Sequence, residues 1–192
     1  MTSTATRGTG AARQRIIDAA VALFFEQGAG GTSLQMIADR SDMTKAAVYY
    51  HFQAKEDILL AVITPALEGV AQVAEAAAAT RSRSASLDIL ITGLIDQVIE
   101  NRRLGAVLWA DPTIAQVVVS HPMLQDVGIR IHRQLIGPNP DPATRVRVSM
   151  FGASLKAASD PALADLDADT VRQQMLDAAR RLLGLRPPRS AT

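Results

Sequence analysis

The side chains best suited to binding a partner lie close together, in the stretch 44–55. Lys45, Tyr49, Tyr50 and His51 fall within seven residues of one another. A lysine can donate hydrogen bonds to guanine, and an alanine methyl can rest on the methyl group of thymine. Lys55 follows at the predicted start of another helix, where its charge and the free backbone amides can face a phosphate.

Two short helices must position these side chains. Thr32 and Gln35 have the spacing of a capping box, which predicts that the first helix begins there. Ile37 and Ala38 supply its buried face, and the pair at 41–42 ends it. Asp42 suits a tight turn because its side chain can bond its own backbone.

The second predicted helix spans 45–51. Thr44 is its N-cap, because a threonine hydroxyl can satisfy an amide of the first turn. Met43, Val48 and Phe52 fall on its inward side. Two helices across a turn of three to four residues, with Lys and Tyr on the second, form the helix-turn-helix pattern that enters the major groove of DNA.

The same stretch resembles the DNA-binding signature of the TetR family of transcriptional repressors. The resemblance covers about residues 11–63 and rests on Thr32-Ser33, Ile37-Ala38, Thr44-Lys45-Ala46-Ala47-Val48-Tyr49-Tyr50-His51-Phe52 and Lys55-Glu56. Two positions depart from the pattern. Asp42 stands where the family's turn usually has glycine, and Ala54 stands where a helix-capping serine or asparagine is common.

The resemblance implies roles for individual residues. Lys45, Ala46 and Ala47 would face base edges, and Tyr49 and His51 would approach phosphates. Gln35 could reach a base or a phosphate, and Tyr50 could pack inward or face the duplex. The predicted DNA-contacting residues are Thr32, Ser33, Gln35, Thr44, Lys45, Ala46, Ala47, Tyr49, Tyr50, His51 and Lys55.

The composition predicts an all-α protein with no disulfide. The 192 residues are rich in Ala and Leu, 4% aromatic and free of cysteine. Residues 1–10 lack the apolar core of a signal peptide, and the longest apolar runs, such as 58–63, are much shorter than a membrane span. We therefore expect a cytoplasmic protein that does not bind a membrane.

Charge alone would not have suggested DNA binding. The chain through Lys55 carries six basic and four acidic residues, a net +2, and the remainder carries 14 basic and 15 acidic residues, a net −1. A weakly basic head on a neutral body is compatible with DNA binding. The motif carries the prediction.

Apolar spacing and loop signals predict about nine helices in all. Outside the two-helix unit the expected helices are 13–27, 55–79, 86–101, 103–110, one that starts at 121–122, 143–159 and 169–183. Pro65 predicts a kink or break near 63–64. The predicted organisation is a disordered tail at 1–10, a helix-turn-helix domain at 11–55, an effector-binding and dimerisation domain at 56–185, and a tail at 186–192.

The sequence provides no support for an enzyme or a metal site. The two other histidines, His121 and His132, lie 70 or more residues from His51, and neither HExxH nor CxxC spacing is present. A Gly-rich phosphate loop and a Gly-x-Ser-x-Gly elbow are also missing. We predict no cofactor, no metal and no catalytic residue.

The body has more apolar helix than a DNA-reading head needs, and polar groups lie near its apolar stripes, which suits a helix-lined pocket. Trp109 could pack in the core or line such a pocket. That this pocket takes a small effector is implied only by the resemblance. The predicted pocket residues are Leu67, Val70, Leu94, Gln97, Val98, Asn101, Trp109, His121, Met123, Phe151 and Ser154.

The helix 143–159 is apolar or small on two faces, which predicts that one face contacts a second copy of the chain. The predicted dimer interface comprises Ser149, Gly152, Ala153, Lys156, Val171, Met175, Ala178 and Leu182. Together with this pattern, the resemblance to the TetR family implies a homodimeric repressor that binds a pseudo-palindromic operator and is released by a small apolar effector. Two alternatives remain open, an effector-free DNA-binding or protein-interaction module and, less favoured, an all-α enzyme.

Overall fold

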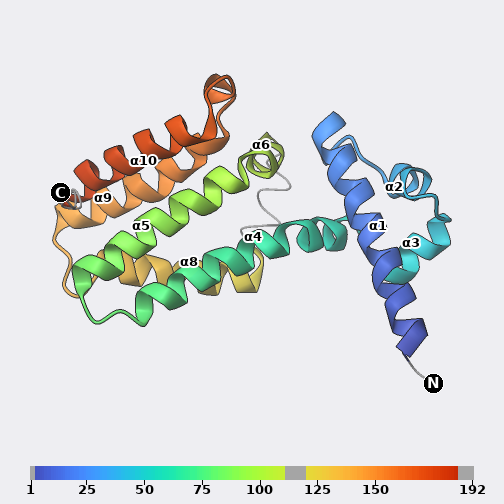
Figure 1. Cartoon of the computed structure of the whole chain (residues 1–192), viewed down its shortest axis with the longest axis horizontal. Helices are drawn as coiled ribbons and strands as arrows, with labels where there is room; N and C mark the ends of the chain where they lie inside the picture. The colour runs from blue at the N-terminus through green and yellow to red at the C-terminus, as the bar shows by residue number, and fades with distance from the viewer. Residues whose placement is uncertain (1–2, 111–119, 186–192) are drawn as a thin grey trace. The chain divides into compact units, whose positions relative to one another are not determined.

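The computed structural model describes residues 3–110 and 120–185, which form nine α-helices and two short 3-10 helices (Figure 1). No strand occurs in these two ranges, which confirms the all-α prediction. The predicted tail 186–192 lies outside the described residues.

The chain divides into two compact units, and the division falls inside a helix. The first unit contains residues 1–65 and 107–119. The second unit contains residues 66–106 and 120–192. The helix that crosses the division is α4 (Lys55–Ala78), with Pro65 in its interior. Of the kink or break predicted near 63–64, the break is wrong, because α4 continues through the proline.

Three helices build the first unit: α1 (Ser3–Gln27), α2 (Leu34–Arg40) and α3 (Lys45–His51). Helix α1 begins at Ser3 rather than at about Arg13, so the predicted tail 1–10 is helical from Ser3. Sequence composition missed this extension because lengthening a helix that is already nucleated costs little per residue. The predicted end is correct, since Gly28 follows Gln27 with φ of 76°.

The core of this first unit comes from the apolar stripes that the sequence indicated. Ile16, Ala20 and Phe24 of α1 are at most 1% exposed. They share the unit's core with Ile37 of α2 and Val48 of α3, which are fully buried. Three helices therefore enclose one small core, which leaves the other sides of α2 and α3 open to solvent.

Helix α4 is also apolar and long enough, by length and composition alone, to cross a membrane. Its N-terminal part buries Ile58, Leu59 and Ile63, and its C-terminal part buries Ala74 and Ala77. Core helices of globular proteins pass the same test.

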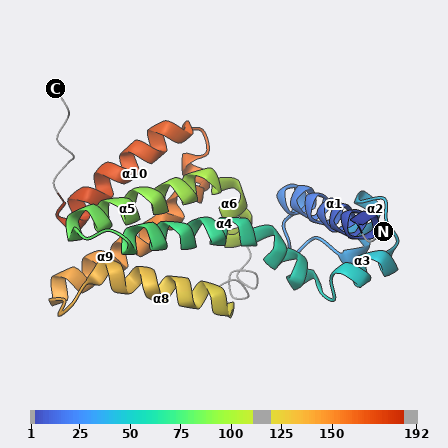
Figure 2. The same cartoon turned by 60° about the horizontal axis from the view of Figure 1, so that its bottom comes forward.

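The second unit contains α4 from Ala66 onward and the start of α6 (Arg102–Ala110) as far as Ala106. It also contains α5 (Arg83–Glu100), α8 (Pro122–Ile136), α9 (Pro142–Ser154), the 3-10 helices η1 (Leu155–Ser159) and η2 (Pro161–Leu163), and α10 (Ala168–Leu183). Within it, α4 and α5 run side by side, α10 lies along α5, and α9 packs against α10 and α8 (Figures 1 and 2). The core is made by Ala77, Leu90, Ile91, Leu94, Ile95, Leu135, Val148, Phe151, Leu176 and Ala179.

Helix α9 is shorter than predicted. It begins at Pro142, where Asp141 accepts a hydrogen bond from the Thr144 amide at 2.6 Å. It ends at Ser154 rather than at 159, and η1 takes over with a tighter turn. The Ser154 hydroxyl donates to the Phe151 carbonyl at 2.7 Å, and such a local bond offers the backbone an alternative to the helical ladder.

Candidate nucleic-acid interface

The turn between α2 and α3 is held by backbone and capping bonds. Ser41 closes α2, and the Met43 amide donates to the Ala38 carbonyl at 3.0 Å. Asp42 sits between them with φ of 54°, in the left-handed region that glycine favours. The departure of this position from the family pattern is therefore tolerated, because aspartate adopts this conformation more readily than most residues.

Helix α3 begins and ends where the sequence predicted. Thr44 is its N-cap, and the Thr44 hydroxyl accepts a hydrogen bond from the Ala47 amide at 3.1 Å. Val48 is fully buried and Phe52 is 4% exposed, so one side of α3 is fixed against α1 and α2. The amide of Phe52 closes the last turn on the Val48 carbonyl at 2.9 Å.

The opposite side of α3 is open. Lys45 and Ala46 are exposed, Tyr49 is 42% exposed and Tyr50 is 78% exposed. The inward alternative for Tyr50 is therefore wrong. The ammonium group of Lys45 lies 5.9 Å from the centre of the Tyr49 ring, so this lysine is partly ordered by its neighbour.

One capping assignment is wrong. Thr32 is buried, and its hydroxyl donates to the Gly28 carbonyl at 2.8 Å, which closes the glycine-rich loop after α1. Ser33 is the N-cap of α2, because its hydroxyl accepts from the Met36 amide at 3.2 Å. The Thr32 side chain is therefore turned away from solvent, whereas Ser33 and Gln35 are exposed.

Lys55, which was predicted to face a phosphate, binds backbone carbonyls of the protein instead. Its ammonium group is half-buried and donates to the Ala29 carbonyl at 2.7 Å and to the Thr32 carbonyl at 3.1 Å. These bonds tie the start of α4 to the loop between α1 and α2. The positive charge predicted for a phosphate is thus engaged within the protein.

The start of α4 is better capped than the sequence suggested. Ala54 lacks a capping side chain, but the Asp57 carboxylate accepts a hydrogen bond from the Ala54 amide at 2.9 Å. This is the returning half of a capping box, and a carboxylate in the first turn also suits the helix dipole. The Ala54 departure therefore leaves α4 with a defined start.

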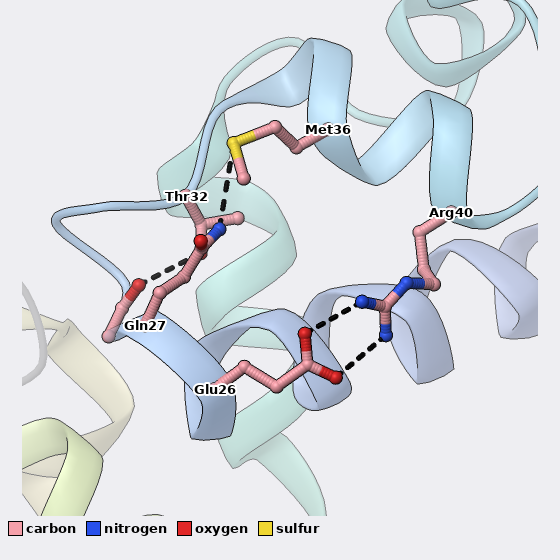
Figure 3. Close-up of polar contacts among 6 residues, drawn as sticks. Glu26, Gln27, Thr32, Met36 and Arg40 are labelled. Carbon is pink, nitrogen blue, oxygen red and sulfur yellow. Dashed lines mark hydrogen bonds and ion pairs between the residues drawn. The ribbon is translucent and has the colours of Figure 1, made fainter.

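An ion pair braces α2 against α1 (Figure 3). Arg40 binds Glu26 with two hydrogen bonds of 3.0 and 2.7 Å. The hydrogen bond from Arg40 lowers the pKa of Glu26, desolvation opposes the shift, and the charge of Arg40 adds to it. Gln27 makes a further link by donating to the Met36 sulfur at 3.5 Å. Local sequence patterns could not predict this brace, because its partners are 14 residues apart.

The structure does not gather the predicted pocket residues into one cavity. Leu94 and Phe151 are buried in the core of the second unit, and the Asn101 amide donates to the backbone of Gln97 at 2.8 Å. Trp109 is 42% exposed, so the core-packing alternative for it is wrong, and it belongs to the first unit. The side chain of Met123 lies outside what the structure describes.

The second unit has an apolar cavity elsewhere, of about 350 Å³. It lies between α5, η1, η2 and α10, so of the predicted pocket residues only Ser154 reaches it. Sequence periodicity could not find this site because it depends on how α9 ends at Ser154. Its lining includes Ile95, Ser154, Leu163, Leu166, Met175 and Ala178.

The predicted dimer residues divide into exposed and buried ones. Ser149, Gly152 and Ala153 are exposed on α9, and Val146 and Met150 beside them are 57% and 53% exposed. One side of α9, with Val148 and Phe151, is therefore buried in the core, and the other side is exposed to solvent. Lys156 and Ala178 are exposed, and Met175 and Leu182 are half-buried. Val171 is 3% exposed, so its assignment to an interface is wrong.

Among the described residues, no group of three His, Asp or Glu side chains is placed to hold a metal ion. His51 instead lies edge-on to Tyr50, with ring centres 5.2 Å apart.

The chain matches known proteins most clearly in its first unit. Residues 16–62 match the family model of bacterial regulatory proteins, tetR family. The transcriptional regulator SrpR of Pseudomonas putida is 47% identical over 51 residues, which are 27% of this chain and 24% of SrpR. The negative transcriptional regulator IcaR of the biofilm operon icaADBC in Staphylococcus aureus is 46% identical over 46 residues, 24% of this chain and 25% of IcaR. The chain thus spans about a quarter of these relatives' length.

Solved structures extend the likeness to the whole fold. A transcriptional regulator from Aquifex aeolicus covers 89% of this chain and 99% of its own, with a TM-score of 0.67 and 16% identity. FadR from Bacillus subtilis, solved with stearoyl-CoA, covers 86% and 96%, with a TM-score of 0.61 and 16% identity. At this identity the likeness concerns the fold. Residues 16–62 thus match the tetR family of bacterial regulatory proteins, and the chain as a whole shares the fold of the solved regulators.

Proposed function

We propose that the chain is a sequence-specific DNA-binding transcriptional regulator that inserts α3 into the major groove. The observation that carries this proposal is the two-sided character of α3. Val48 fixes its inner side and Thr44 caps its start, while Lys45, Ala46 and Tyr49 face solvent together. A short capped helix with an open polar side, held by a rigid partner helix, is the geometry of a recognition helix.

Individual contacts follow from this geometry. Lys45 donates to guanine, and Ala46 and Ala47 pack on thymine methyl groups. Tyr49, Tyr50 and His51 lie towards the C-terminal end of α3, where their side chains reach the phosphate backbone. Ser33, Gln35 and Thr44 complete the contact surface from α2 and the turn.

We further propose a homodimeric, cytoplasmic repressor. Because seven residues of α3 read few base pairs, two copies must bind half-sites about 34–36 Å apart or a multiple of that spacing. The exposed side of α9 with Ser149, Gly152 and Ala153 suits close packing against a second copy. The negative regulator IcaR among the relatives supports repression.

A small apolar effector is proposed to release the protein from DNA. The apolar cavity of the second unit and the solved complex of FadR with stearoyl-CoA support this part. A thermal-shift screen against apolar metabolites tests it, because a compound that binds only the folded state raises the melting temperature by mass action. A screen without any shift favours the effector-free alternative.

Selection of bound duplexes from a random DNA pool tests the DNA-binding proposal itself. We expect a pseudo-palindromic consensus, and we expect Lys45→Ala and Tyr49→Ala to weaken its binding by about 1–3 kcal/mol each. Arg81→Ala, which removes an exposed cation between α4 and α5, serves as the matched control and should bind normally. Failure to enrich any sequence, or equal affinity in all variants, would refute the assignment.

A further inference from the structure

Few cations of the first unit are available for DNA. The basic residues whose side chains the structure describes there are Arg13, Arg15, Arg40, Lys45 and Lys55. Arg40 is paired with Glu26 through two hydrogen bonds, and Lys55 is bound to two backbone carbonyls. Of the other three, Lys45 is on α3 itself, and Arg13 and Arg15 are on α1.

Arg13 lies beside the C-terminal end of α3. It stands three and four residues before the buried Ile16 and Ile17, so it continues the inward stripe of α1 beyond the end of the core. Its guanidinium carbon lies 4.9 Å from the centre of the Phe52 ring. Phe52 is the residue that caps α3, so this stacking places an exposed cation against the residue that directly follows His51.

The contact with the Phe52 ring uses none of the N–H donors of Arg13 in a hydrogen bond. A guanidinium carries five such donors in a fixed planar fork. The described residues provide Arg13 with no hydrogen bond, and Arg13 is exposed. A planar fork held in place loses little conformational entropy when it binds a phosphate in two-pronged fashion.

We propose that Arg13 is a DNA-backbone contact, which binds a phosphate beside the bases that α3 reads. This inference rests on the proposed function, since it needs α3 in the major groove. It assigns to α1 a direct part in DNA binding. Arg15 has no such role, because two residues along a helix turn its side chain to another face.

The test measures affinity for the selected consensus duplex as a function of salt concentration. The variants are Arg13→Gln, which removes the charge, Arg13→Lys, which keeps it without the planar fork, and the matched control Arg15→Gln. Melting temperatures show that each variant is folded. We expect Arg13→Gln to bind about tenfold more weakly, in line with the loss of one charged hydrogen bond. Its salt slope should fall by about one, because the variant neutralises one phosphate fewer than the wild type.

The other variants sharpen the result. Arg13→Lys should keep the wild-type salt slope and lose less affinity than Arg13→Gln, whereas Arg15→Gln should match the wild type. A weakened Arg13→Gln with an unchanged salt slope overturns the inference, because Arg13 then only supports Phe52. Equal losses in Arg13→Gln and Arg15→Gln also overturn it, since the effect is then one of overall charge.

These outcomes are separable from a failure of the proposed function. If the wild-type protein enriches no duplex, the proposed function fails before Arg13 is tested. If the wild-type protein binds its consensus and Arg13→Gln binds with the same affinity and slope, only the inference about Arg13 fails.

Discussion

Lys55 connects three segments of the first unit through one side chain. Its ammonium group bridges the Ala29 and Thr32 carbonyls from the start of α4, and Thr32 in turn binds Gly28. The loop that precedes α2 is therefore fixed by a charge that comes from the helix after α3. This arrangement makes Lys55 a part of the scaffold of the two-helix unit.

A substitution separates this scaffold role from a phosphate contact. We expect Lys55→Met to destabilise the protein by about 1–3 kcal/mol, because it removes the charged donor of two part-buried hydrogen bonds. The salt slope of DNA binding should stay at its wild-type value. Urea unfolding followed by circular dichroism measures the first quantity. Lys45→Met is the control, with the opposite expectation of normal stability and weaker binding to the consensus duplex. A reduced slope in Lys55→Met would restore the phosphate role.

At this scale the sequence predicted the residues whose partners are close in the chain. Thr44 caps α3 through an amide three residues ahead, and Asp42 makes a turn that depends on its own backbone. Lys55 and Arg13 could not be assigned in the same way. The carbonyls that bind Lys55 lie 26 and 23 residues away, and Arg13 meets Phe52 only after three helices have packed.

The contact between α1 and α2 contains an ion pair, Glu26 with Arg40, whose contribution to stability depends on pH. The hydrogen bonds from Arg40 lower the pKa of Glu26 below the usual value of 4.5. The pair therefore contributes stability that is fully present above the ordinary pKa of a glutamate. This contribution is lost as the pH falls through the lowered pKa of Glu26.

Because the pKa of Glu26 is lowered, the ion pair between α1 and α2 should stabilise the protein at neutral pH and not in acid. Glu26→Gln should melt at a lower temperature than the wild type at neutral pH, and the difference should shrink as the pH falls below about 4. The effect is small because both partners are exposed. Glu75→Gln, an exposed glutamate on α4, should show no such convergence. A difference that persists unchanged into acid would mean that the ion pair is not its source.

The contact between α4 and α5 depends on a glycine. A Cβ atom at Gly93 would lie 2.6 and 2.7 Å from the two methyl groups of Val73. We expect Gly93→Ala to destabilise the protein by about 1–3 kcal/mol, because a β-branched side chain cannot easily move away. Val73→Ala in the same protein should recover most of this loss, as measured by urea unfolding. If the double variant is no more stable than Gly93→Ala, the close approach of α4 and α5 is not the cause.

Apolar spacing predicted which segments form helices, but it predicted the first and last residues of those helices less accurately. The start of α3 and the start of α8 after His121 agree with their signals because a cap or a proline marks them. The start of α1 and the end of α9 carry no such mark. Leu94 and Phe151 were predicted to line a pocket, but apolar spacing cannot tell a cavity wall from a packed core.

For the whole molecule, the exposed side of α9 leads to a test of assembly. A Cβ atom at Gly152 would meet nothing within 4 Å in its own chain, so a large side chain there does not disturb the fold. We expect Gly152→Arg to be a monomer, as measured by sedimentation, and to bind the consensus duplex poorly. Gly128→Arg on α8, which is equally open, is the control and should remain dimeric. A dimer in Gly152→Arg would move the interface away from this side of α9.

Pro65 lies where the two compact units divide. The sequence predicted a domain boundary after Lys55, whereas the compact units divide ten residues later within one continuous helix. Pro65 cannot donate the helical hydrogen bond to the carbonyl four residues earlier, which makes bending there less costly. An effector can shift the equilibrium only by binding a DNA-incompetent state more tightly than the competent one.

We expect Pro65→Ala to change the loss of DNA affinity that the effector causes, with effector binding itself less affected. The measurement is affinity for the consensus duplex with and without the compound that the thermal-shift screen identifies, which gives the coupling free energy. Pro142→Ala is the matched control, because Pro142 opens α9 where no helical donor is needed, so its coupling should equal that of the wild type. If the coupling in Pro65→Ala also agrees with the wild type within about 0.3 kcal/mol, the error expected for independent sites, then Pro65 takes no part in transmission. The stiffness of α4 at the division would then be irrelevant to release from DNA.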